Sequence, residues 1–158
     1  MDPAPPLLVD AAARVTAVIC AAILMSIPIY VVMAWVIVGQ RGAAPAGGGL
    51  PSVVTWALAA VGAALLAAGQ ALWAALRRSA ASRPTLEERL ATYRTAAVVS
   101  FAVRESAAIV GLAITLLTGD LRWCLVLGAA AVLAMLLGWP RRADIARLAA
   151  DPAAAPIG

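Results

Sequence analysis

The sequence predicts an all-α, polytopic integral membrane protein with four transmembrane helices in two antiparallel hairpins. Composition is the first indication, because 64% of the 158 residues are hydrophobic and only 13% are charged. A soluble domain has roughly 45–50% apolar and about 25% charged residues. The mean hydropathy of +0.95 agrees with this class. We therefore expect a single transmembrane domain over residues 1–158.

Four long apolar stretches are the second indication. They cover the following residues: 15–38, 52–76, 95–118 and 121–139. A helix needs about 20 residues to cross a hydrocarbon core of about 30 Å, so each stretch is long enough. The first stretch exceeds the roughly 7–15 apolar residues of a signal peptide, and only Arg14 precedes it as a positive flank. We expect this first helix to remain uncleaved.

The start of the third helix is marked by capping residues. Thr85 and Glu88 have the spacing of a capping box, and they come directly after Pro84. This pattern predicts a third helix over residues 85–118, which is longer than its apolar stretch. Its first ten or so residues are therefore expected to extend into the cytoplasm.

The fourth helix is expected to pack closely on the third. Gly119 and Asp120 predict a tight turn, which makes these two helices antiparallel neighbours. After the fourth helix, residues 142–158 are rich in Ala and Pro, and we predict a mostly disordered cytoplasmic tail.

The positions of the arginines are the third indication, and they predict the orientation. Nine fall on one side of the four stretches: Arg14, Arg77, Arg78, Arg83, Arg89, Arg94, Arg141, Arg142 and Arg147. The opposite side has only Arg41 and Arg122. Because positive loops stay in the cytoplasm, both termini are expected there, in a bacterial-type inner (cytoplasmic) membrane. This topological role accounts for the basic pI near 10.0, so we expect no nucleic-acid partner.

The third stretch contains two charges, Arg104 and Glu105, about halfway along. A charge at this depth costs about 2.5–3.5 kcal/mol on insertion scales, so it usually faces protein or water. On a helical wheel, Arg104 shares a face with small or polar residues: Ser100, Ala108, Gly111 and Thr115. Small residues favour close helix packing, so we predict that this face, with Arg104, lies inside the bundle.

Glu105 falls on a different face of the same helix. Its neighbours there are mostly large and apolar: Val98, Phe101, Ala102, Ile109, Leu112 and Leu116. We therefore predict that Glu105 points toward lipid or toward another protein.

The second helix consists mainly of small residues, most of them alanine, with Gly62 and Gly69 as expected sites of close packing. Gln70 is its only strongly polar residue in the membrane. At 1.5 Å per residue, Gln70 lies about 10 Å and Glu105 about 15 Å from the cytoplasmic ends of their helices. We expect the two to interact, either within one hairpin or between protomers.

Residues 53–118 resemble the helical hairpin of the proteolipid c subunit of rotary ATP synthases. The shared features are the small-residue helix, a cytoplasmic loop with the letters SRP, the pair Arg94–Thr95, and the run FAVRESAAIVGLAITLL. In that family a carboxylate at the position of Glu105 carries a proton or sodium ion reversibly. The resemblance implies that Gln70 and Ser106 help to hold the ion. The first and fourth helices and Arg104 have no counterpart there, so we do not expect a rotor subunit.

We expect no enzymatic activity, no metal site and no cofactor. The chain has no His, its two cysteines, Cys20 and Cys124, are isolated, and it has no acidic cluster or glycine-rich phosphate loop. The expected function is that of a structural or accessory subunit in a larger membrane assembly, with the Arg104–Glu105 pair at the contact. Its partners would be the lipid bilayer and other membrane subunits or further copies of itself. The alternative is a homo-oligomeric proteolipid that translocates protons or sodium through Glu105.

Overall fold

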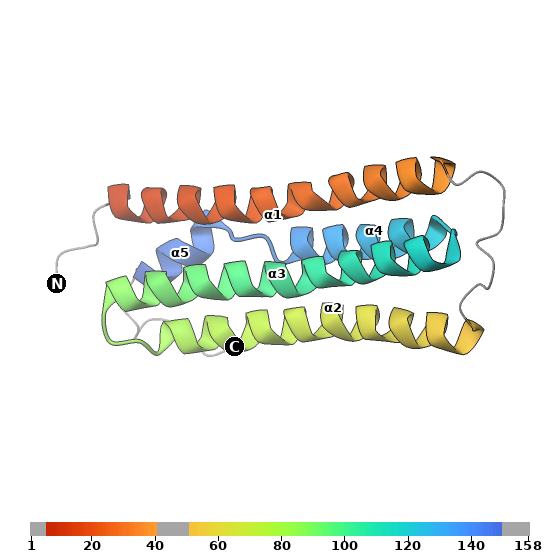
Figure 1. Cartoon of the computed structure of the whole chain (residues 1–158). Coiled ribbons are helices and arrows are strands. Elements are labelled where there is room, and N and C mark those ends of the chain that lie inside the picture. The colour runs from red at the N-terminus through yellow and green to blue at the C-terminus, as the bar shows by residue number, and fades with distance from the viewer. Residues whose placement is uncertain (1–5, 41–50, 150–158) are drawn as a thin grey trace.

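The structure, a computed structural model, describes residues 6–40 and 51–149, without the side chains of 6–9 and 149. It contains five helices: α1 (Pro6–Gln40), α2 (Ser52–Ala81), α3 (Leu86–Thr118), α4 (Arg122–Leu137) and α5 (Arg142–Ala149). The described residues form no strand, which confirms the all-α prediction. Helices α1 to α4 run along one long axis, each antiparallel to the one before it, whereas the short α5 is tilted from this axis (Figure 1).

Three of the helices, α1, α2 and α3, are long and apolar enough to cross a membrane. A fourth span results if α4 and α5 count as one, although these two meet at an angle of 45°. The helices also extend beyond the apolar stretches. For example, α1 begins at Pro6 instead of residue 15, because the helix continues through polar residues past the stretch that hydropathy detects.

The third helix lies at the centre of the bundle. Figure 1 shows α3 between α1 and α2, with α4 and α5 behind this layer. Twelve residues of α3 are buried, whereas α2 and α4 have five each. Side chains on several faces of α3 therefore meet other helices of the same chain.

Both ends of α3 form as the sequence predicts. The side chain of Thr85 caps the start by accepting a hydrogen bond from the backbone N–H of Glu88, at 3.2 Å. At the other end, Gly119 takes the left-handed conformation with φ 75°, which favours glycine. The Thr115 hydroxyl then donates to the Asp120 carbonyl (3.0 Å) and accepts from the Cys124 N–H (2.9 Å), which fixes the tight turn into α4.

The first part of the C-terminal segment is helical, so the prediction of a mostly disordered tail is wrong for residues 142–149. Ile145 of α5 is 1% exposed and belongs to the core of the bundle. Two ion pairs connect α5 to other helices: Arg142 pairs with Asp10 of α1 at 2.6 Å, and Asp144 pairs with Arg77 of α2 at 3.3 Å. An eight-residue helix is marginal alone, so this packing stabilises it. The rest of the predicted tail lies outside the described residues.

Candidate functional site

Arg104 is completely buried, as the sequence predicts. Its Nη2 donates to Oε1 of Gln70 at 3.0 Å and, more weakly, to the carbonyl of Gly69 at 3.5 Å. The Gln70 amide in turn donates to the carbonyl of Ala134 at 3.2 Å. Gln70 therefore connects the guanidinium of α3 to the backbone of α4.

Two glycines leave the space that the Arg104 side chain occupies. A Cβ atom on Gly69 would lie 2.7 Å from Cγ of Arg104, and one on Gly138 would overlap Nη1 and lie 2.9 Å from Nη2. The guanidinium carbon also lies 5.7 Å from the ring centre of Phe101, which packs edge-on against Trp139. This position of Arg104 therefore depends on the absence of side chains at residues 69 and 138.

No carboxylate in the described part of the chain forms an ion pair with Arg104, and its Nε and Nη1 atoms have no hydrogen-bond partner there. The guanidinium instead lies against Gly138, which caps the C-terminus of α4. The 16 residues of α4 cover about 24 Å from the Asp120 turn, and Arg104 lies 14 residues, or about 21 Å, from the same turn along α3. A helix C-terminus carries about half a negative charge. The buried cation thus lies level with this negative helix end.

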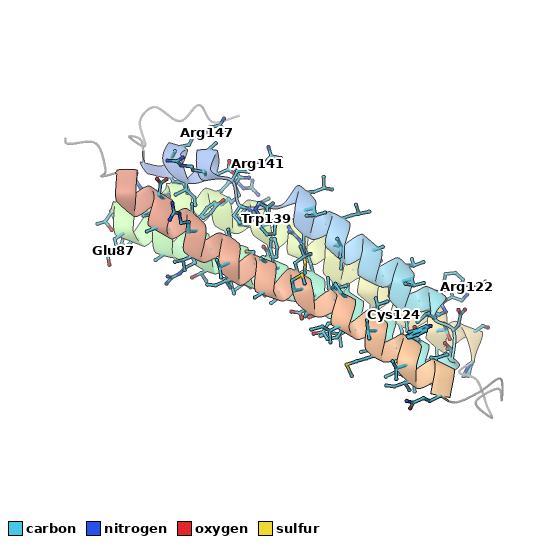
Figure 2. The ribbon with its side chains drawn as sticks, turned by 90° about the horizontal axis from the view of Figure 1, so that it is seen from above. Glu87, Arg122, Cys124, Trp139, Arg141 and Arg147 are labelled. Atoms are coloured by element: carbon cyan, nitrogen blue, oxygen red, sulfur yellow. The ribbon has the colours of Figure 1, made fainter. Side chains whose placement is uncertain are left out.

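The end of α4 lies within the bundle and not at its surface end. Figure 2 places Trp139, just after α4, between the two ends that are marked by Arg122 and by Arg147. A helix end inside a membrane needs protein groups to satisfy its carbonyls, because lipid offers no donors. Gln70 provides such a donor to Ala134.

Glu105 makes its contacts with α1. Its Oε1 accepts hydrogen bonds from the hydroxyls of Ser26, at 2.5 Å, and Tyr30, at 2.6 Å. The prediction that Glu105 points away from its own chain is therefore wrong for this oxygen. Phe101, assigned by the wheel to the same outward face, is also buried. The wheel ordered the faces of one helix, but it contained no information on where α1 packs.

The second carboxylate oxygen of Glu105 has no hydrogen bond within the described part of the chain. Glu105 and Ser106 are half-buried, and the neighbouring Ala102 and Ile109 are exposed. This side of α3 therefore presents an open carboxylate oxygen near the middle of an apolar surface.

The residues that the resemblance groups with Glu105 lie elsewhere. Gln70 bonds to Arg104, and Ser106 donates to the Ala102 carbonyl of its own helix at 3.0 Å. The oxygens near Glu105 come instead from Ser26 and Tyr30, which the sequence patterns did not single out. Their spacing could have indicated a shared site, because two hydroxyl residues four positions apart lie on the same face of a helix.

The residues predicted to mediate helix packing are all buried: Gly62, Gly69, Ser100, Ala108, Gly111 and Thr115. A Cβ on Gly62 would lie 3.1 Å from the Leu127 side chain, and one on Gly111 would lie 2.9 Å from Leu127 Cβ. Gly62 of α2 and Gly111 of α3 therefore leave room for the Leu127 side chain of α4.

The described residues contain no group of three His, Cys, Asp or Glu side chains placed to hold a metal ion. Cys20 and Cys124 are buried free thiols. Comparison of the chain with protein-family models, with curated proteins and with solved structures found no match.

Proposed function

We propose that this chain is a non-enzymatic, four-span inner-membrane protein that acts as a structural or accessory subunit of a larger membrane assembly. In this proposal both termini lie in the cytoplasm and α4 with α5 makes the fourth span. The exposed arginines of residues 77–94 and 141–147 support this orientation. Figure 2 shows Arg141 and Arg147 at one end of the bundle, and the ion pair of Arg77 with Asp144 brings the end of α2 to the same place. We call this end of the bundle the arginine-rich end; it carries Arg77, Arg78, Arg83, Arg94, Arg141, Arg142 and Arg147.

The open oxygen of Glu105 is the observation that carries the proposal. Ser26 and Tyr30 hold Oε1, whereas the other oxygen has no donor within the described residues. An ionised group facing hydrocarbon costs about 2.5–3.5 kcal/mol on insertion scales. A donor from a neighbouring membrane subunit would remove this cost. The proposed contact with a partner therefore involves Glu105. Arg104 is buried and bonds to Gln70 inside the bundle, so it does not contact the partner directly.

The surface of α2 supports a protein neighbour as well. Its exposed face consists largely of alanine: Ala57, Ala60, Ala63, Ala64, Ala67, Ala68, Ala71, Ala74 and Ala75. The exposed faces of α1 and α4 carry large side chains instead, including Met25, Ile29, Trp35, Leu133 and Leu137. Large side chains are suited to lipid, and small ones allow another helix to approach closely. Within one molecule, this contrast distinguishes α2.

Purification from native membranes in a mild detergent, followed by mass spectrometry, tests the proposal. In Glu105→Gln the amide oxygen still accepts from Ser26 and Tyr30, but an NH₂ group replaces the open oxygen. We expect this variant to fold and to lose proteins that copurify with the wild type. Glu88→Gln makes the same chemical change at an exposed position and should retain them. The same copurifying proteins in all three samples would contradict the proposal.

A proton- or sodium-carrying proteolipid is the second candidate function. The same open carboxylate favours it, because a carrier must be reached from outside the bundle. Carbodiimide labelling separates the two functions. A carrier should label at Glu105 near neutral pH, with protection by sodium if sodium is its ion, and Glu105→Gln should abolish flux. An accessory subunit should not label, and the substitution should affect assembly.

A further inference from the structure

A shallow hollow lies on the outer side of α3, toward the arginine-rich end of the bundle. It has a volume of about 180 Å³, and four residues line it: Arg94, Thr95, Val98 and Val99. All but Val98 are exposed, so the hollow opens outward. Its volume is below the roughly 300–1,000 Å³ of an enclosed small-molecule site. The hollow therefore suits one part of a larger molecule that lies along the helix.

The guanidinium of Arg94 is available for such a molecule. It forms no ion pair or hydrogen bond with the described residues. Two other exposed arginines at the same end are already paired, Arg77 with Asp144 and Arg142 with Asp10. Arg94 thus combines an unneutralised charge with an adjacent hollow.

The lining of the hollow changes from charged to apolar at the depth where the lipid headgroups give way to the hydrocarbon core. The segment from Val98 to Thr118 covers about 30 Å, which matches a hydrocarbon core. Arg94 lies one turn, about 6 Å, beyond it. Arg94 is therefore at headgroup depth and Val98 is at the start of the acyl chains.

We propose that this hollow binds an anionic phospholipid. The phosphate accepts hydrogen bonds from the Arg94 guanidinium, whose planar fork matches two phosphate oxygens. An acyl chain lies across Val98 and Val99. A lipid supplies both the negative charge and the apolar chain, whereas a free phosphate supplies only the charge. This inference does not depend on the proposed role in an assembly.

Native mass spectrometry of the full chain with added phosphatidylglycerol tests the proposal. Arg94→Gln should weaken binding about five-fold, since one arginine near the surface contributes about 1 kcal/mol to anionic-lipid binding. Val99→Trp keeps the charge but fills the hollow, so it should weaken binding too. Arg147→Gln removes an equally exposed arginine from α5 and should leave binding unchanged.

Three results would overturn this assignment. Equal losses in Arg94→Gln and Arg147→Gln would show only general charge attraction. Unchanged binding in Val99→Trp would show that the hollow is not occupied. Wild-type binding of phosphatidylcholine as tight as that of phosphatidylglycerol would show that anionic charge is not recognised. Thermal unfolding of each variant checks that it folds, which is expected because Arg94 and Val99 are exposed.

Discussion

Arg104 and Glu105 are adjacent in the sequence, but they point from α3 toward different helices. Successive residues in an α-helix are about 100° apart, so the two charges do not form one pair. Arg104 faces α2 and the end of α4, and Glu105 faces α1. Each charge is stabilised separately, by a glutamine and a helix end in one case and by two hydroxyls in the other.

The fit of Arg104 between two glycines leads to a prediction for Gly69→Ala. The added methyl would lie 2.7 Å from Arg104 Cγ, and crowding of this kind costs about 1–3 kcal/mol. Unfolding in detergent measures the loss. Gly39→Ala is the control, because a Cβ there meets nothing within 4 Å. In an Arg104→Ala background the cost should shrink, and an equal cost in both backgrounds would show that the arginine is not the crowded group.

The hydrogen bond from Tyr30 to Glu105 leads to a second prediction. Tyr30→Phe should reduce stability by about 0.6 kcal/mol, the average for polar contacts between membrane helices, and by no more than about 1.7 kcal/mol, the largest value for such contacts. Tyr93→Phe is a matched control, because the buried Tyr93 hydroxyl forms no hydrogen bond with another side chain of the described residues and its loss should cost less. Unfolding of both variants gives the comparison, and a larger loss for Tyr93→Phe would contradict the assigned contact.

At the scale of elements, the break between α4 and α5 determines much of the arrangement. The break ends α4 next to Arg104 and allows α5 to turn by 45°. Arg89 of α3 supports the turned helix by donating to the Leu148 carbonyl at 3.3 Å. The ion pairs on α5 are exposed at their arginine ends, where such pairs contribute at most about 1 kcal/mol. Burial of Ile145 therefore stabilises the docked α5 more than these ion pairs do.

Ile145→Ala should accordingly release α5. Truncation of a buried isoleucine costs about 2–5 kcal/mol, which exceeds the contribution of the two ion pairs together. We expect faster amide hydrogen exchange in residues 142–149 than in the wild type. Ala146→Ser, an exposed change in the same helix, should leave exchange slow. Slow exchange in Ile145→Ala would show that the ion pairs alone hold α5.

At the scale of the whole molecule, the arrangement separates two kinds of surface. The arginine-rich end carries most of the positive charge, and Figure 2 shows Arg122, which follows the turn at Asp120, at the opposite end. Between the ends, α1 and α4 expose large apolar side chains and α2 exposes alanines. The large apolar side chains of α1 and α4 are suited to contact with lipid, and the alanine face of α2 is suited to contact with a neighbouring helix.

The proposed orientation predicts opposite labelling of the two ends. Ser82, just after α2, and Asp120, just after α3, are exposed at opposite ends of the bundle, whereas Cys20 and Cys124 are at most 1% exposed. In Ser82→Cys, an impermeant maleimide should react only from the cytoplasmic side of sealed vesicles. In Asp120→Cys it should react only from the other side. Reaction of both from the same side would contradict the four-span topology, and the unsubstituted chain controls for the native thiols.

Local features of the chain were predictable, and contacts between distant segments were not. The cap at Thr85 and the turn at Gly119 depend on a few adjacent residues, so their patterns suffice. Burial of Arg104 followed from the small residues on its face. The partners of Glu105 did not follow, because Ser26 and Tyr30 lie more than 70 positions away. Gln70 and Glu105 have similar depths, yet depth along an axis does not specify which way a side chain points.

The amino-acid sequence alone predicted the all-α class, the two ends of α3 and one of its buried faces, the one that carries Arg104. Each depends on hydropathy, capping chemistry or the 3.6-residue period, which operate over short stretches of chain. The packing of the helices adds three features: α1 binds one oxygen of Glu105, α4 ends at the level of Arg104, and α5 folds back as a helix. These features arise where separate helices pack together, and packing depends on side chains that are far apart in the sequence.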